Sequence, residues 1–259
     1  MREIYAVLTL ACRDLLKLLR DPTRLISELM FPLLFIVILG GSLQSSFGIG
    51  SNFDYITYIF TGVFAQTLFQ SASMGVVSLI DDRENDFSQE VFVSPISRYT
   101  IILGKILGET LVAMTQALGI LVFGFAAGVR FSFWQLIGLG WSGIVTCLFG
   151  AAFGVIILSN LNNRRTADQV FPYIMLPQFF LAGVFNPIQK LPWYLDFLSR
   201  IAPMRYAVDL TRDIFYPGRN DYVNAVLQGP AYNLMLMTVA FLVFLFIGTF
   251  LFVRKEQNR

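Results

Sequence analysis

Histidine is absent from this 259-residue chain, and cysteine is scarce. Without histidine, Ser-His-Asp catalysis, Cys-His catalysis and histidine-ligated zinc are excluded as activities of the chain. The two cysteines, Cys12 and Cys147, lie in apolar helical contexts without a partner pattern, so they indicate packing and no redox chemistry. A phosphate-binding loop is also missing, because the one Gly-Lys pair, Gly104-Lys105, lacks the upstream glycine and the following Ser or Thr. We therefore expect no ATP hydrolysis by this chain alone, no cofactor and no bound metal.

Charged residues are also scarce. Only 14% of the residues are charged, whereas 56% are apolar and 15% are aromatic. A soluble domain carries about 25% charged residues, and a disordered chain carries few aromatic ones. The net charge of +2 is too small to indicate a nucleic-acid partner. The composition therefore predicts an integral membrane protein.

Long apolar runs are what the chain has in abundance. A membrane helix needs about 20 mostly apolar residues, because it crosses roughly 30 Å of hydrocarbon at about 1.5 Å per residue. About six such runs are present, which predicts an all-α membrane protein with a single domain over residues 1–259. The fifth run is the weakest prediction because Pro172 and Pro177 interrupt it. The six runs are residues 25–44, 55–80, 101–129, 134–158, 166–185 and 232–253.

The distribution of basic residues predicts the orientation of these runs. Thirteen of the 19 basic residues fall on one face, before the first run, in two of the connections and after the last run. Short cytoplasmic loops carry such an excess of Lys and Arg, and long loops translocate regardless of charge. The sequence therefore predicts a multi-pass plasma-membrane protein with both termini in the cytoplasm. These basic residues are Arg2, Arg13, Lys17, Arg20, Arg24, Arg83, Arg98, Lys105, Arg164, Arg165, Arg254, Lys255 and Arg259.

Residues 1–22 predict an amphipathic helix that lies in the lipid headgroup plane. Apolar side chains, including Ile4, Leu8 and Leu19, share one projected face, and Asp14 shares the other face with the basic side chains. Asp21-Pro22 ends this helix before the first run. A simple anchor that only fixes the topology is the alternative.

Several polar side chains fall inside the apolar runs. Lys105 and Glu109 are one helical turn apart, so the sequence predicts an ion pair whose side chains extend toward the headgroups. A role in substrate or proton passage is the alternative for Glu109, because carboxylates inside membranes are costly. Gln66 and Gln70 either bond neighbouring helices or line a wet path.

Two connections carry more specific patterns. Residues 81–98 begin with clustered acids and continue into an apolar patch that stops at Pro95. A short surface helix there would offer Phe87 and Phe92 beside carboxylates to a cytosolic partner, and an inert loop is the alternative. Residues 186–210 are rich in aromatics and prolines, which predicts a re-entrant or interfacial helix pair outside the cytoplasm.

The order of these features resembles the type-2 ABC transporter permeases. The amphipathic start, about six spans and two series of motifs together carry the resemblance, which covers essentially the whole chain. The small bacterial permeases of the daunorubicin-resistance and nodulation-export kind look most similar. The first series runs from Asp82-Arg83-Glu84 through Ser94-Pro95-Ile96-Ser97 to Gly104-Lys105, and the second from Ala182-Gly183 through Pro187, Leu191-Pro192, Pro203, Tyr206 and Asp209 to Arg212.

The resemblance implies a half-transporter. A second copy or a related permease would complete the membrane pathway, and two cytosolic ABC ATPase subunits would bind ATP and Mg below it. The 82–98 stretch would be the coupling helix, residues 1–22 the elbow helix and residues 186–210 the re-entrant segment. Coupling to the ATPase would involve Asp82, Arg83, Glu84, Phe87, Phe92 and Pro95, and substrate would meet Gln66, Gln70, Phe179 and Phe180.

The substrate is left open by these patterns. Apolar and aromatic residues with a few amides favour export of an amphipathic drug-like or lipid-like compound. A polysaccharide or lipo-oligosaccharide is the alternative substrate, and a non-transporting assembly scaffold is the alternative of another class. A membrane enzyme is disfavoured because no paired carboxylates or nucleophile-base set converge in the runs.

Overall fold

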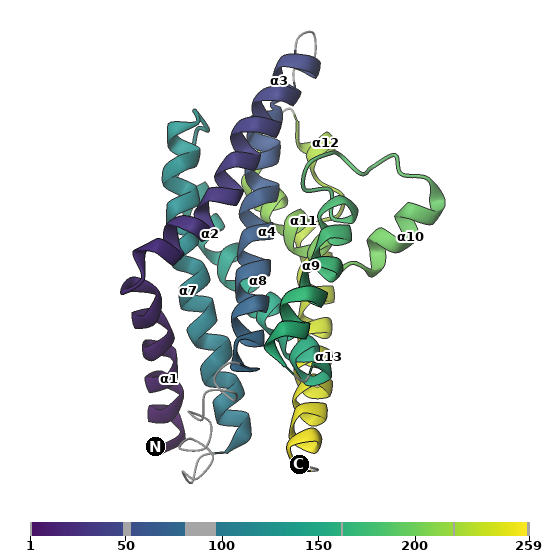
Figure 1. The fold of residues 1–259 in the computed structure, drawn as a ribbon. Coiled ribbons are helices and arrows are strands. Elements are labelled where there is room, and N and C mark those ends of the chain that lie inside the picture. The colour runs from purple at the N-terminus through teal and green to yellow at the C-terminus, as the bar shows by residue number, and fades with distance from the viewer. Residues whose placement is uncertain (1, 49–52, 81–96, 162, 220, 258–259) are drawn as a thin grey trace.

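The computed structural model describes residues 2–48, 53–80, 97–161, 163–219 and 221–257, and the elements it defines there are helices. Both ends of the chain lie at the same end of a helical bundle (Figure 1). The opposite end of the bundle is called the distal end below. The elements are α1 (Arg2–Leu19), α2 (Pro22–Phe35), the π-helical η1 (Ile36–Gly40), α3 (Gly41–Phe47), α4 (Tyr55–Val77), α7 (Arg98–Ala126), α8 (Phe133–Asn160), α9 (Arg164–Leu181), α10 (Trp193–Ile201), α11 (Pro203–Phe215), α12 (Tyr222–Ala225) and α13 (Pro230–Gln257).

Local capping explains where several of these helices begin and end. The Asp21 carboxylate accepts from the Arg24 amide at the start of α2, and the Asp54 carboxylate does the same for Thr57 at the start of α4. At the end of α9, Gly183 has a φ of +70°, which lets the Val184 amide bond back to the Phe179 carbonyl at 3.1 Å. These caps satisfy backbone groups that a membrane cannot hydrate.

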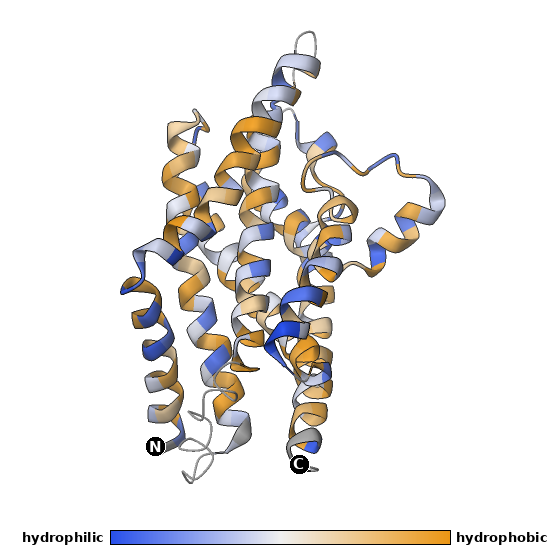
Figure 2. Ribbon diagram, in the orientation of Figure 1, coloured by the Kyte–Doolittle hydropathy of each residue, from blue (hydrophilic) through white to orange (hydrophobic). Residues whose placement is uncertain are grey.

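Within the described residues, four segments are long and apolar enough to cross a membrane, which confirms the all-α membrane class. They are Pro22–Phe47, Tyr99–Ala126, Phe133–Asn160 and Tyr222–Arg254. Figure 2 shows α13 as apolar along most of its length. The predicted fifth run forms α9 with Pro172 and Pro177 inside it, but the helix ends at Leu181 and starts with polar residues. The count of six spans stays a prediction.

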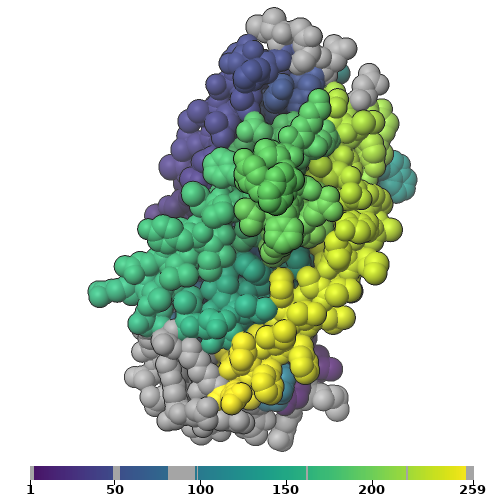
Figure 3. Space-filling view, turned by 90° about the vertical axis from the view of Figure 1, so that its right-hand side faces the viewer, coloured from purple at the N-terminus to yellow at the C-terminus, as the bar shows by residue number. Residues whose placement is uncertain are grey.

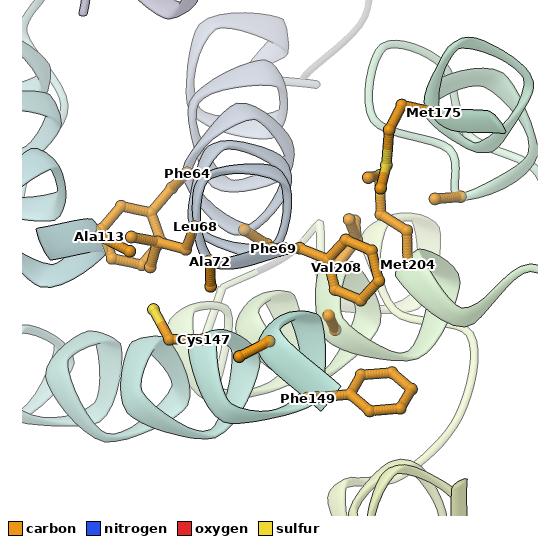
Figure 4. Close-up of a cluster of buried hydrophobic side chains, with 14 of the residues drawn as sticks. Phe64, Leu68, Phe69, Ala72, Ala113, Cys147, Phe149, Met175, Met204 and Val208 are labelled. Carbon is orange, nitrogen blue, oxygen red and sulfur yellow. The ribbon is translucent and has the colours of Figure 1, made fainter. Parts of the chain in front are cut away.

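α4 occupies the centre of the bundle and most of its residues are buried. It is not among the four spanning segments and carries polar Thr, Gln and Ser residues, and burial among other helices offers such groups protein partners. Phe64, Leu68 and Ala72 point toward α7 and α8, while Phe69 lies between α8 and the pair α9 and α11 (Figure 4). The fold is therefore organised around one buried helix.

Glycines allow α4 and α8 to approach closely. A Cβ atom added to Gly150 would lie 2.5 Å from the Phe69 carbonyl oxygen. At the same contact, the Ser73 hydroxyl donates to the carbonyl oxygens of Phe69 and Gly150 at 2.7 and 2.6 Å. The 134–158 run thus packs on α4 through a small residue, as membrane helices commonly do.

α1 forms as predicted, but the assignment of Asp14 to its exposed polar face is wrong. Val7, Ala11, Asp14 and Leu18 recur at intervals of four, three and four, and this stripe faces α7, where Ala11 contacts Gly108. Ile4, Leu8 and Leu19, which the sequence assigns to the apolar face, are exposed. α1 runs alongside the first half of α7 (Figure 1), and its position relative to the headgroups stays a prediction.

The 186–210 connection contains the predicted helix pair, α10 and α11, although α11 continues to Phe215. α11 is buried against α4, α8 and α13, whereas α10 projects from the bundle (Figure 1). Whether the pair re-enters the membrane stays a prediction.

Candidate functional site

A groove opens between α2, α4 and α9, with α7 at its side, and has a volume of about 660 Å³. Its size lies within the range of small-molecule sites in proteins. Three of the four predicted pathway residues, Gln66, Gln70 and Phe179, line this groove together although they come from two helices. Substrate contact by these residues remains a prediction.

The α4 wall of the groove is polar. Gln66, Thr67, Gln70 and Ser71 line it in one turn and a half of helix. The Oε1 atom of Gln66 and the hydroxyl of Thr67 are buried and have no hydrogen-bond partner among the described residues. Because unpaired buried acceptors are costly, these atoms favour a ligand or water that donates hydrogen bonds in the groove.

The opposing walls are apolar. α2 contributes Phe31 and Pro32, and α9 contributes Phe171, Met175 and Phe179. The fourth predicted pathway residue, Phe180, is not among the lining residues. Its side chain is 62% exposed and its ring lies 5.9 Å from that of Phe185. In one copy of the chain, Phe180 therefore faces outward.

Ion pairs mark one end of the groove. The Arg24 guanidinium donates to the Glu28 carboxylate at 2.7 Å, and the Gln116 amide of α7 also donates to Glu28. Arg164, which begins α9, bonds Asp168 at 2.8 Å. These residues lie near the starts of α2 and α9, so this rim is charged while the interior is apolar and amide-lined.

Behind the α4 wall, three charged side chains meet between α1, α4 and α7. Lys105 Nζ lies 2.8 Å from the Glu109 carboxylate, which confirms the predicted pair, and 3.0 Å from the Asp14 carboxylate. Lys105 and Glu109 are only 5% and 4% exposed. α1 covers both side chains and supplies Asp14 as a second anion, and their depth relative to the headgroups stays a prediction.

Glu109 also reaches the groove wall indirectly. Its carboxylate packs directly on Gly75 of α4, a residue whose other side lines the groove. One carboxylate oxygen, Oε2, is buried and has no hydrogen-bond partner among the described residues. A side chain at position 75 would displace this carboxylate, so Gly75 leaves room for the Glu109 side chain between α4 and α7.

A second buried charge holds the distal half of the groove helices together. The Arg212 guanidinium of α11 stacks 3.6 Å from the Tyr58 ring centroid and donates to the Gly183 carbonyl at 2.8 Å. The Tyr58 hydroxyl donates to the same carbonyl at 3.0 Å. Arg212 therefore joins α4, α11 and the turn that ends α9, which carries Phe179.

The predicted coupling residues lie outside the described residues. Asp82, Arg83, Glu84, Phe87, Phe92 and Pro95 all fall within 81–96. Ser97 directly follows this stretch and caps α7, with the Thr100 amide donating to its hydroxyl at 3.2 Å. The Thr100 hydroxyl in turn donates to Glu3 of α1. The start of α7 is therefore tied to α1 at the point where the predicted coupling stretch ends.

Some of these contacts had no sequence prediction. The sequence analysis assigned Asp14 to the polar face of α1 because its side chain is charged. Its spacing relative to Val7, Ala11 and Leu18 was the signal that could have placed it on the buried face. Arg212 and Asp209 entered the sequence analysis only through the family resemblance. Asp209 accepts from the Leu227 and Gln228 amides and from Asn233, at 2.7 to 2.9 Å. No local sequence pattern predicts that Asp209 bonds residues about 20 positions further along the chain.

Comparison with known proteins agrees with this architecture. The ABC-2 type transporter family matches residues 5–216, so the chain belongs to this family of membrane transport permeases. The chain is 23% identical over 216 residues to ycf38 of Cyanophora paradoxa, named as a transport permease, and the match covers 82% of this chain and 74% of ycf38.

Two bacterial relatives carry similar names. YbhR of Escherichia coli strain K12, named as a multidrug ABC transporter permease, is 26% identical over 172 residues, which cover 63% of this chain and 45% of YbhR. YadH of the same strain, named as an inner membrane transport permease, is 25% identical over 179 residues, which cover 68% of each chain. The shared word in all three names is permease, and none specifies a compound.

Proposed function

We propose that this chain is the membrane subunit of an ATP-driven exporter that moves an amphipathic drug-like or lipid-like compound out of the cytoplasm or the inner leaflet. In this proposal two copies, or this chain and a related permease, form the pathway in the bacterial inner membrane, with both termini in the cytoplasm. Two separate ABC ATPase subunits bind ATP and Mg. The multidrug permease name of YbhR is consistent with such a substrate.

The groove between α2, α4 and α9 is the observation that carries this proposal. One wall offers amides and hydroxyls with unpaired acceptors, and the facing walls offer Phe31, Met175 and Phe179. A compound with an apolar body and a donor-bearing polar end satisfies both walls at once. A long sugar chain is supported less well, because it needs a continuous surface of stacking aromatics.

The proposed coupling route starts where 81–96 joins α7. Motion of this stretch would reach α7 at Ser97, α1 through Thr100 and Glu3, and the Lys105 cluster one turn further along. Glu109 packs on Gly75, so the same motion would reach the groove wall on α4. This contiguous series of contacts supports a coupling role for the stretch. Coupling between two sites needs a structural element whose conformational equilibrium both sites shift.

Transport in vesicles tests the proposal. The chain is reconstituted with its cognate ATPase, and ATP-dependent accumulation of a fluorescent amphipathic amine is followed in inside-out vesicles. Phe179→Ala and Gln66→Leu should each lower the transport rate about tenfold, because a lost aromatic or polar contact removes on the order of 1–2 kcal/mol. The matched control is Phe246→Ala on α13, where the ring is 77% exposed and far from the groove lining. Equal transport by all four proteins would overturn the groove assignment.

A further inference from the structure

A second cavity lies at the distal end of the bundle and is separate from the groove. It has a volume of about 630 Å³ and is formed by α10, the start of α11, α12 and the turn before α13. Its lining residues fall between Ile188 and Gly229, and the proposed transport function uses none of them. Its charged lining residues are Asp196, Arg200 and Arg205.

Two arginines converge on one carboxylate there. Arg200 Nη2 lies 2.8 Å from Asp196, and Arg205 Nη1 lies 3.3 Å from it and 2.8 Å from the Ser199 hydroxyl. The hydrogen bond from Arg200 first, and that from Arg205 next, keep the pKa of the Asp196 carboxyl below its usual value. The carboxylate is therefore ionised at neutral pH, and the described lining still carries one positive charge in excess.

Two further acids near this cavity, Asp209 and Asp213, are already engaged. Asp209 lies behind the turn before α13, where two backbone amides and the Asn233 side chain donate to its carboxylate. Asp213 accepts from the Tyr222 hydroxyl. The excess charge of Arg200 and Arg205 therefore faces the cavity with guanidinium donors suited to a phosphate or carboxylate.

The other face of α10 is apolar and uncovered. Trp193 is 83% exposed, and Tyr194, Phe197, Leu198 and Ile201 are also exposed. Figure 3 shows α10 and its large side chains standing out from the surface between α9 and α13. An aromatic face of this kind is typical of the membrane-water boundary.

The position of the cavity fits the same boundary. Gly229 lines the cavity, and α13, which belongs to one of the four membrane-crossing segments, begins at the next residue. The Tyr206 hydroxyl of α11 donates to the Arg200 carbonyl at 2.6 Å and holds the end of α10 beside the bundle. Anionic recognition and an apolar face thus adjoin each other at the end of a spanning helix.

We infer that this cavity binds the phosphate headgroup of an anionic phospholipid whose acyl chains lie along the exposed face of α10. Arg200 and Arg205 contact the phosphate, while Trp193 and Phe197 contact the chains. A free phosphate would use the arginines and leave the aromatic face exposed. A second copy of the chain would cover the aromatics and gain nothing from the excess positive charge.

Tryptophan quenching tests the inference in the full-length chain. Trp134 and Trp141 are replaced by Phe, so that Trp193 becomes the single emitter, and the protein is placed in phosphatidylcholine vesicles. A small fraction of the lipid is then exchanged for brominated phosphatidylglycerol or brominated phosphatidylcholine. We expect brominated phosphatidylglycerol to quench Trp193 more strongly than brominated phosphatidylcholine. Arg200→Gln should lower the relative affinity for the anionic lipid about fivefold, the usual contribution of one basic residue at a membrane surface.

The matched control removes the same charge from the same connection. Lys190 is exposed and does not line the cavity, so Lys190→Gln should keep the preference. Equal quenching by the two lipids, or equal loss in both variants, would overturn the inference. Displacement of the lipid by millimolar inorganic phosphate would assign the site to free phosphate, and absence of quenching by either lipid would assign the α10 face to a second copy.

This measurement is independent of the proposed export function, because it needs neither the ATPase nor a transported compound. If the groove variants transport as well as the wild type while Trp193 is still quenched more strongly by the anionic lipid, the exporter proposal alone is refuted. The reverse result would refute the lipid site alone.

Discussion

Lys105 is the residue that joins the buried charges between α1 and α7. It lies between Asp14 of α1 and Glu109 of its own helix, at 3.0 and 2.8 Å. Arg13 also forms an ion pair with Asp14 at 2.8 Å. If Lys105 is replaced by a neutral residue, Asp14 therefore keeps one cationic partner, whereas Glu109 loses the cation that lies against it. A buried carboxylate left in this state is costly.

We therefore predict that Lys105→Met destabilises the chain by about 3–5 kcal/mol, the usual cost of removing one partner from a buried ion pair. Unfolding in mixed micelles by added sodium dodecyl sulfate measures this difference. A triple variant that also carries Asp14→Asn and Glu109→Gln should recover most of the loss, because no uncompensated charge remains. Wild-type stability in Lys105→Met would show that the cluster is solvated in the membrane.

At the scale of elements, glycine lets the backbones of α4 and α8 approach each other closely. Gly150 meets the Phe69 backbone, and Ser73 bonds across the same contact. Packing and short polar contacts are what hold helices together in lipid, where the hydrophobic effect does not act between them.

Gly150→Ala should destabilise the chain by about 1–3 kcal/mol, because the added methyl group lies 2.5 Å from the Phe69 carbonyl oxygen and forces the helices apart. Gly140→Ala on the same helix meets nothing within 4 Å, so it should be neutral or slightly stabilising. Thermal unfolding in detergent compares the two variants. Equal melting temperatures would contradict the close contact of α4 and α8.

The predicted coupling stretch, 82–98, can be tested as an element. Glu84→Lys places a like or unpaired charge at the partner surface, and Phe92→Ala removes an apolar anchor. Both variants should insert normally yet lose substrate-stimulated ATPase activity in the reconstituted complex by roughly 5–150-fold, the usual range of coupling between sites. Asn258→Ala in the C-terminal tail serves as the control. Full activity in both loop variants with the complex intact would identify the stretch as an inert connection.

At the scale of the whole molecule, both termini lie at one end of the bundle and the α10–α12 region lies toward the other (Figure 1). This arrangement agrees with an even number of crossings, and the excess of basic residues predicts that the end with the termini is cytoplasmic.

Cysteine labelling of intact cells checks this orientation. In a background of Cys12→Ser, which keeps only the buried Cys147, cysteines introduced one at a time at Ser46 and Asn186 should react with a membrane-impermeant maleimide, because both positions are exposed and lie on the predicted outer side. A cysteine at Asn163, which caps α9 on the predicted inner side, should react only after lysis. Labelling of Asn163 in intact cells would reverse the orientation.

Local patterns in the sequence predicted much of the architecture. Apolar length gave the membrane class and the places of the long helices, since hydrocarbon admits only chains that satisfy their own backbone. Helix spacing gave the Lys105–Glu109 pair, and proline and aromatic clustering gave the α10–α11 pair. The family resemblance, and no local pattern, implied a shared pathway for Gln66, Gln70, Phe179 and Phe180, and the first three of these line one groove.

Tertiary structure alone decided which side chains from distant segments meet. Asp14 faces Lys105 because α1 lies along α7, and Arg212 reaches the end of α9 because α11 enters the bundle. Phe180 turns outward beside Phe179, since one residue rotates a helical position by about 100°. Sequence periodicity determines which face of each helix is apolar, whereas the pairing of those faces depends on how all the helices pack at once, and no single helix carries that information.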